Sequence, residues 1–421
     1  MRAPILYHNL CSNLTHSESN EALKAGETKG QAVRHAILIA LMVTFTAVTA
    51  PPAHAGSGGD PFNGWITGAE PFPQGPHHRL QHHVRQSRTY FATTALIDGL
   101  LRAVGAVAKA HPDGEQTLIG NLSKRNGGNI PDSRTHNSGR DVDIVFFMER
   151  LDGRAVRPNN HHYGRDGLSR RSPKHFRFDI EANWALIEAL ASNQAMGLQW
   201  VIIEPHLELL MLKHAKAQGL SGAELRRYAD LMTLPPYAGP HENHMHLRIQ
   251  CPVADWQDRC QPTGPVWQWN VHHLPPIVAM AKEHAAGFKA RKARDRAKAI
   301  ETAWAKGLTP LVAEALPLLD DPDQRVRRRA RKMLLVLIDP ETAPRALEVA
   351  ETLKPVSRRL VTLWVLRRGG LAALPTAEAV MAGTHPTVSP KPRTSTLRDL
   401  QVAARRLLIR ERPVAELLGL D

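Results

Sequence analysis

Aromatic residues and long apolar runs are scarce in this sequence, and each scarcity narrows what the chain can be. Phe, Trp and Tyr make up 5% of the 421 residues, so aliphatic side chains must supply most of the core. The most apolar run, residues 36–50, is about fifteen residues long, whereas a membrane-spanning helix needs roughly 20. Zinc-finger, RRM and P-loop patterns are also missing, which argues against a nucleic-acid partner.

What the sequence does have is an ordinary globular composition and a large positive charge. Hydrophobic residues make up 43% and charged residues 22% of the chain, which excludes general disorder. The formal net charge is +14, and the basic residues recur in clusters along the chain. Such a surplus favours a polyanionic partner. With nucleic acid set aside, the candidates are anionic lipid and an acidic cell-wall polymer.

Residues 1–55 are predicted to be an N-terminal extension followed by a signal peptide. A basic pair precedes the apolar run, and a small-x-small site for a signal peptidase ends at Ala55. The polar stretch before the run is too long for an ordinary signal, so we expect translation to start at Val33. The sequence therefore predicts a periplasmic protein that keeps no stable transmembrane segment after cleavage.

Two of the three cysteines would remain in the exported protein. Cys251 and Cys260 lie close together in a loop-like stretch, CPVADWQDRC. In an exported protein this spacing favours a disulfide that closes a short loop. A pair of free thiols is the alternative.

The mature chain changes character along its length, which predicts a first domain of mixed elements over residues 56–284 and an all-α domain over 285–421. In the first part, helices are expected over residues 93–110, 180–193, 207–217 and 222–232. Strands are expected over residues 116–122, 142–147, 199–203 and 246–249. Mixed elements without a βαβ rhythm favour an α+β domain with a small antiparallel sheet. The Gly-, Pro- and His-rich residues 56–88 are expected to be irregular.

One stretch of the helical part, DDPDQRVRRRARKMLLVLIDP, resembles a HEAT repeat. Its residues Val326, Ala330, Leu334 and Leu337 would fall on one face of a helix. HEAT-like stacks usually bind other proteins, so a protein partner is possible through this domain. An ordinary helical bundle is the alternative.

Residues 135–143, THNSGRDVD, combine metal-ligand side chains with a turn and a strand. His136 precedes a turn at Gly139, which can fold the imidazole back towards the following strand. Asp141 and Asp143 lie two residues apart on that strand, so they share one of its faces.

Residues 241–246, HENHMH, repeat this spacing with imidazoles. His244 and His246 lie two residues apart and therefore share a face of their own strand. Two adjacent antiparallel strands would bring both segments into one cleft. The antiparallel sheet is therefore expected to carry the site.

The residue types in the two segments meet the needs of zinc catalysis. A catalytic zinc takes three protein ligands and keeps a position open, and the reaction needs a nearby base that is not a ligand. His136, Asp143 and His246 supply the ligands, and His244 supplies the base. A lone histidine means little in a chain with 22 of them, and His-x-His alone is a weak signal. The conjunction of the two segments is far more specific.

Together these segments resemble the lysostaphin and D-alanyl-D-alanine metallopeptidase group, and specifically its penicillin-insensitive murein endopeptidase branch. The likeness covers residues 115–262 and includes NLSKRNGG, GRDVDI, HENHMHLR and the two-cysteine tail from Cys251. The branch usually has a further histidine where this chain has Ser133. The helical C-terminal third is an addition to the family pattern.

The resemblance implies the site residues that the spacing predicts. It implies Zn²⁺ bound by His136, Asp143 and His246, with His244 as the general base. It adds His241 as a second active-site histidine that contacts the substrate or the transition state.

The reaction that the resemblance implies is hydrolysis of D-alanyl–meso-diaminopimelyl cross-links in peptidoglycan, without an acylated serine, so β-lactams should not inhibit. Asp141 is expected either to orient a ligand or to cap the turn. Arg248 or protonated His241 is expected to stabilise the oxyanion. The alternatives are a D,D-carboxypeptidase, a protein-directed metallopeptidase and a non-catalytic wall-binding scaffold.

Overall fold

The computed structural model describes residues 54–131, 133–235, 238–256, 259–388 and 394–420. The predicted N-terminal extension and signal peptide fall almost wholly on residues 1–53, outside the described residues. Their cleavage therefore stays a prediction. Within the described residues, no helix combines the length and the apolar character that crossing a membrane requires.

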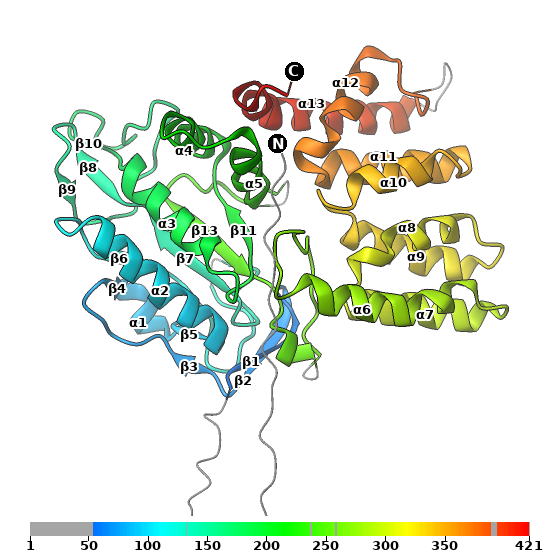
Figure 1. The fold of residues 1–421 in the computed structure, drawn as a ribbon, viewed down its shortest axis with the longest axis horizontal. Helices are drawn as coiled ribbons and strands as arrows, with labels where there is room; N and C mark the ends of the chain where they lie inside the picture. Colours follow the sequence, from blue (N-terminus) through cyan, green and yellow to red (C-terminus); the bar gives the residue numbers. More distant parts are fainter. Residues whose placement is uncertain (1–53, 132, 236–237, 257–258, 389–393, 421) are drawn as a thin grey trace, which may run out of the picture. The chain divides into compact units, whose positions relative to one another are not determined.

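The described residues belong to one compact unit, in which an α/β part is followed by a helical part (Figure 1). The strands are β1 (Gly56–Asp60), β2 (Asn63–Thr67), β3 (Glu70–Pro71), β4 (His78–Leu80), β5 (Phe91–Ala92), β6 (Thr117–Ile119), β7 (Asp141–Val145), β8 (Met148–Arg150), β9 (Ala155–Val156), β10 (Phe176–Phe178), β11 (Leu198–Ile202), β12 (Met232–Thr233) and β13 (His244–Ile249). The α-helices are α1 (His82–Ser87), α2 (Thr94–Ala110), α3 (Ile180–Ser192), α4 (Pro205–Ala217), α5 (Gly222–Leu231), α6 (Leu274–Ala285), α7 (Ala293–Ala305), α8 (Val312–Ala315), α9 (Gln324–Leu337), α10 (Ala343–Ala350), α11 (Pro355–Arg368), α12 (Leu374–Ala382) and α13 (Thr394–Leu418). The short 3₁₀ helices are η1 (Val253–Trp256), η2 (Ala286–Lys289), η3 (Thr309–Leu311), η4 (Leu316–Asp320) and η5 (Gly370–Ala373).

A six-stranded sheet in the order β12-β11-β13-β7-β6-β4 forms the centre of the α/β part. The four inner strands pair antiparallel, as the sequence predicts. The two outer strands, β12 and β4, are parallel to their neighbours, so the sheet as a whole is mixed. The strands that carry the two predicted segments, β7 and β13, are direct neighbours.

Alternation along β7 and β13 separates a packed face of the sheet from a polar one. The side chains of the packed face are all apolar and fully buried: Val142, Ile144, Met245, Leu247 and Ile249. Helices α2 and α3 lie side by side across the sheet, and their buried side chains belong to the same hydrophobic core (Figure 1). The opposite face of the same strands carries the carboxylates and imidazoles.

Helix α2 forms where the sequence predicts it. Thr93 caps its first turn by accepting a hydrogen bond from the Leu96 amide, at 3.4 Å. The predicted stripe of four apolar residues is buried, each at most 4% exposed: Leu96, Leu100, Val104 and Val107. Burial of this stripe, rather than helix propensity alone, fixes the helix on the sheet.

The expectation that residues 56–88 are irregular is wrong, because this segment contains β1 to β4 and α1. Strands β1 and β2 form an antiparallel hairpin in which Gly58 lies opposite Trp65. A Cβ atom at Gly58 would lie 2.1 Å from the indole ring, so the ring occupies the space of the missing side chain. A strand built on glycine shows no alternation of side chains, which is why the pattern does not reveal it.

The helical part has a second hydrophobic core, which includes the predicted face of α9. Val326, Ala330, Leu334 and Leu337 are all fully buried in it. The helical C-terminal region is therefore confirmed, whereas its assignment as HEAT repeats stays a prediction.

Helix α13 links the two parts of the structure. Its residues Val414 and Ala415 belong to the core of the α/β part. The Lys216 ammonium on α4 donates a hydrogen bond to the Leu417 carbonyl at 2.6 Å. The domain boundary between residues 284 and 285 stays a prediction.

Candidate metal centre

The pairing of β7 with β13 places the predicted ligands on one face of the sheet. His246 lies directly opposite Asp143, and Arg248 lies opposite Asp141, so each pair points to the same side. The loop before β7 brings the remaining predicted ligand, His136, to the same face. It reverses at Gly139, whose φ of 72° is a left-handed conformation that glycine adopts at little cost.

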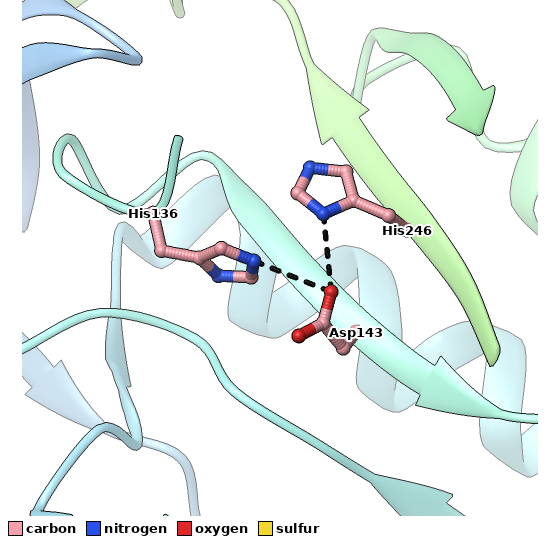
Figure 2. Close-up of side chains that lie close together, drawn as sticks. All are labelled: His136, Asp143 and His246. Carbon is pink, nitrogen blue, oxygen red and sulfur yellow. Dashed lines mark hydrogen bonds and ion pairs between the residues drawn. The ribbon is translucent and has the colours of Figure 1, made fainter. Parts of the chain in front are cut away.

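Two imidazoles converge on one carboxylate oxygen (Figure 2). The Oδ1 atom of Asp143 lies 3.2 Å from Nε2 of His136 and 3.0 Å from Nδ1 of His246. One ligand atom from each residue lies within 4.8 Å of the others. Ligands around a single tetrahedral zinc ion, bound at about 2.0–2.2 Å, are themselves about 3.4 Å apart, so the three atoms fit one ion.

Hydrogen bonds to the outer ring nitrogens orient both imidazoles. Nδ1 of His136 donates to the Leu122 carbonyl at 2.8 Å, and Nε2 of His246 donates to Oδ1 of Asp141 at 2.7 Å. The inner nitrogens are left to face Asp143. Nε2 of His136 is buried and makes no hydrogen bond within the described part of the chain. An orphaned imidazole nitrogen aimed at a carboxylate suits a cation between them.

The charges around His246 also favour a cation at this place. Burial alone would lower the pKa of this imidazole, but its hydrogen bonds to Asp141 and Asp143 raise it to about 9. A second proton on His246 would therefore lie between the ring and Asp143. A metal ion bound there takes the place of that proton.

Asp141 and Asp143 are both held in the ionised form. Burial opposes this, but Arg248 and the hydrogen bond from His246 lower the pKa of Asp141 to about 2. The pKa of Asp143 is likewise held well below its usual range against burial by His136 and His244. Arg248 reaches Asp141 through Nε at 2.8 Å and Nη2 at 2.7 Å.

His244 lies beside the three-residue group without joining it. Its Nε2 atom is 3.7 Å from Oδ1 of Asp143, while Nδ1 donates to the Asn243 side chain at 2.6 Å. Burial lowers the pKa of His244 to about 4, further than the nearby Asp143 charge raises it. At neutral pH its Nε2 therefore carries a free lone pair, which can accept a proton.

His241 lies in the same cluster of histidines. Its ring centroid is 4.9 Å from that of His244 and 6.1 Å from that of His246. Its Nδ1 donates to the Gly239 carbonyl at 2.7 Å. Burial is the main cause that lowers the pKa of His241, so the neutral ring presents Nε2 as an acceptor.

Two positioning residues were missed by the sequence analysis. The Glu204 carboxylate accepts the His241 amide at 3.0 Å, and Asn243 orients His244. Glu204 lies just after β11 and directly before Pro205, the first residue of α4. In the sequence this position reads as an ordinary helix start, so it gives no sign of a role at the metal centre. Only the fold brings it to the histidines, more than thirty positions later in the chain.

The predicted disulfide between Cys251 and Cys260 is confirmed, and both residues are buried. Residues next to it pair with the first strand, because the Gln261 amide donates to the Gly59 carbonyl at 2.8 Å. Buried Arg140, the residue directly before β7, donates to the Gln261 carbonyl at 3.2 Å. The disulfide loop is thus tied to the loop that carries His136.

No curated protein matches the chain. A family model does match it, over residues 57–270, which is about half of the sequence and contains every residue of the cluster. The match agrees with the buried His136, Asp143 and His246 group, which could hold a metal ion. The chain therefore belongs to the penicillin-insensitive murein endopeptidase family.

Proposed function

We propose that the protein is a zinc-dependent endopeptidase that hydrolyses D-alanyl–meso-diaminopimelyl cross-links of peptidoglycan. Family membership supports a peptidase that acts on murein. One observation carries the finer proposal. Both imidazoles are turned by their outer hydrogen bonds to face Asp143, and a separate neutral histidine stands 3.7 Å from the same carboxylate.

In this proposal His136, Asp143 and His246 hold the zinc ion. When bound, zinc supplies Lewis acidity that polarises the scissile carbonyl and acidifies the attacking water. Two imidazoles and one carboxylate are a common ligand set for catalytic zinc, although other divalent ions accept the same donors.

His244 serves as the general base and then as the general acid. Its Nε2, 3.7 Å from Oδ1 of Asp143, keeps a free lone pair, because Asn243 fixes the proton on Nδ1. It takes a proton from the attacking water and returns that proton to the leaving amine of the diaminopimelyl residue. A base that already ligated the metal could not do this.

Asp141 and Arg248 have a positioning role in this scheme. Asp141 accepts a hydrogen bond from His246, and Arg248 contacts the same carboxylate through two nitrogen atoms. We assign the substrate contact to His241, whose neutral Nε2 can accept a hydrogen bond from a substrate amide or hydroxyl.

The proposed place of action is the periplasm, reached through the predicted signal peptide. The net charge of +14 favours retention on an acidic wall polymer. The helical C-terminal region is the proposed place for a protein partner.

The test is chromatography of the muropeptides that the full protein releases from isolated peptidoglycan. We expect cross-linked dimers to fall and monomers to rise in step, with the activity lost on chelation and restored by zinc. His246→Ala should lose both metal and activity. His244→Ala should keep about one zinc per chain but lose about 100-fold or more in rate.

Other outcomes separate the alternatives. Dimers that persist while terminal D-alanine is released would identify a D,D-carboxypeptidase. Bound zinc without any change in muropeptides would favour a protein substrate. If the protein binds no zinc and leaves the muropeptides unchanged, it would be a wall-binding scaffold. Penicillin should leave the activity unchanged, since no serine is acylated.

A further inference from the structure

Beside the metal centre lies a basic pocket that the mechanism does not use. It is a cavity of about 620 Å³, and its polar lining is dominated by Arg79, Arg157, His82 and His83. No aspartate or glutamate is among the described residues that line it. A cavity with two guanidinium groups and no carboxylate is suited to an anionic ligand.

The arginines of the basic pocket come from two segments that are fastened together. Arg79 lies on β4, and its Nη2 donates to the Pro158 carbonyl at 3.1 Å. Gln81, just after β4, donates from Nε2 to the Asn160 side chain at 2.9 Å. These bonds hold the loop after β9, and with it Arg157, against the end of β4.

The pocket adjoins the metal centre at Gly120. A Cβ atom at this glycine would lie 2.9 Å from Cβ of Asp143 and 3.2 Å from Oε1 of Gln81. Asp143 of the metal centre and Gln81 of the pocket wall are therefore both close neighbours of Gly120.

The two guanidinium groups are poised for a ligand from outside. Arg157 is exposed and makes no hydrogen bond or ion pair with any residue that the structure describes. Burial and the nearby Arg157 charge lower the pKa of Arg79, against a smaller opposite effect of Glu115. Two like charges held together without a carboxylate between them repel each other, and a bound carboxylate would relieve that repulsion.

We propose that the basic pocket binds the free carboxylate of the diaminopimelyl residue next to the scissile bond, an inference that rests on the proposed function. In that substrate the leaving amine and a free carboxylate are attached to the same carbon. A group so close to the scissile nitrogen must lie beside the metal centre when the bond is held there. Amidation of this carboxylate removes the charge, so Arg79 and Arg157 make the enzyme selective for substrates that are not amidated.

The test compares two synthetic cross-linked peptides that differ only in this group, a free carboxylate or its amide. We expect the wild-type protein to favour the free acid in kcat/KM by roughly 10-fold or more, as sites built to pair a polar group do. In Arg157→Gln this preference should collapse, through a higher KM for the free acid with kcat little changed. Arg157→Lys should retain part of the preference.

Arg154→Gln is the matched control. Arg154 lies three positions earlier, is 74% exposed, and pairs with Asp152 outside the pocket. It should leave both substrates unaffected. Equal losses on both substrates in Arg157→Gln, or a wild-type protein that does not distinguish them, would overturn the proposal while leaving the proposed function intact.

A calorimetric titration separates failure of the pocket from failure of the function. If the wild-type protein cleaves neither peptide, the proposed function fails. Binding of a diaminopimelyl tripeptide with its free carboxylate then decides the role of the pocket. Binding that is lost in Arg157→Gln and kept in Arg154→Gln supports it, whereas no binding, or equal binding by all three proteins, refutes it.

Discussion

At the scale of single residues, the candidate centre depends on what each ring nitrogen faces. His246 sits between two carboxylates that differ in burial and role. Asp141 is fully buried behind the ring, whereas the side chain of Asp143 is 16% exposed. A carboxylate behind a ligating imidazole fixes the tautomer and makes the ring a better donor to the metal. The centre therefore consists of the three candidate ligands and of a further carboxylate, Asp141, that orients one of them.

Replacing Asp141 with Asn should weaken the metal site without removing a ligand. The amide cannot carry the charge that orients the His246 ring, and the ion pair between Arg248 and Asp141 is lost. We expect metal affinity to fall about 10- to 100-fold, measured by competition with a chromogenic chelator. Asp152→Asn, at an exposed carboxylate that pairs only with Arg154 among described residues, is the control. Unchanged affinity in Asp141→Asn would argue that Asp141 merely caps the turn.

At the scale of elements, strands and short loops with little apolar surface are held by specific cross-links. The disulfide loop pairs with β1 through Gly59 and with the His136 loop through Arg140. Each of these segments is too short to be stable alone. The Cys251–Cys260 bond therefore acts on the metal centre through the loops that it keeps in place.

The double variant Cys251→Ala with Cys260→Ala should destabilise the protein. Opening so short a loop removes about 2–3 kcal/mol in the chain-entropy account, seen as a lower melting temperature. We also expect weaker zinc binding, because the His136 loop loses a support. Reduction of the wild-type disulfide should reproduce both effects. A melting temperature that stays unchanged under both treatments would contradict this.

The turn between α9 and α10 carries a titratable group, Asp339, whose effect on stability has a definite sign. Asp339 is 1% exposed, and its Oδ1 accepts from the Thr342 amide and hydroxyl, both at 2.9 Å. Burial raises its pKa from 3.8 to about 6. The folded state therefore holds this proton more tightly than the unfolded state. Its stabilising effect is full below pH 4 and is lost as the pH rises through 6.

Asp339→Asn should remove that pH dependence while keeping the acceptor for Thr342. Relative to the variant, the wild-type protein should lose roughly 3 kcal/mol of unfolding free energy between about pH 4 and pH 7. Denaturant titrations of both proteins at several pH values measure the difference. A difference that is constant across this range would show that Asp339 is ionised throughout.

At the scale of the whole molecule, the two hydrophobic cores are joined through the C-terminal helix. Val414 on α13 is 1% exposed and packs in the core of the α/β part, together with Leu371 and Leu374. Arg410 on the same helix donates to the Leu234 carbonyl at 3.1 Å. The family pattern stops near residue 270, yet the core of the matched region is completed from beyond it.

Val414→Ala should therefore destabilise the peptidase part from a distant point in the sequence. We expect a loss of about 1–3 kcal/mol, since a buried side chain is cut back and leaves a cavity. Val402, on the same helix but 44% exposed, gives the matched control Val402→Ala, which should change stability little. Calorimetry should show one transition that shifts as a whole. Two transitions, with only the helical one shifted, would contradict the coupling.

The sequence by itself determined the chemistry of the centre, because that information is local. Two residues of one strand that share a face are fixed by the pleat, so Asp141 with Asp143, and His244 with His246, could be paired without any structure. The spacing of the apolar residues likewise determined α2 and α9. The roles of His241 and Arg248 could not be settled this way, since they depend on which neighbour each side chain meets.

Only the tertiary structure decided what lies around the ligands. The packing of Gln81 and of Asp143 beside Gly120, the support of His241 by Glu204 and the completion of the core by Val414 bring together residues far apart in the chain. Such contacts leave no periodic trace, because each depends on strand order and loop path. The glycine-rich β1 was hidden for a related reason. Its partner Trp65 supplies the packing that a strand normally shows in its own side chains.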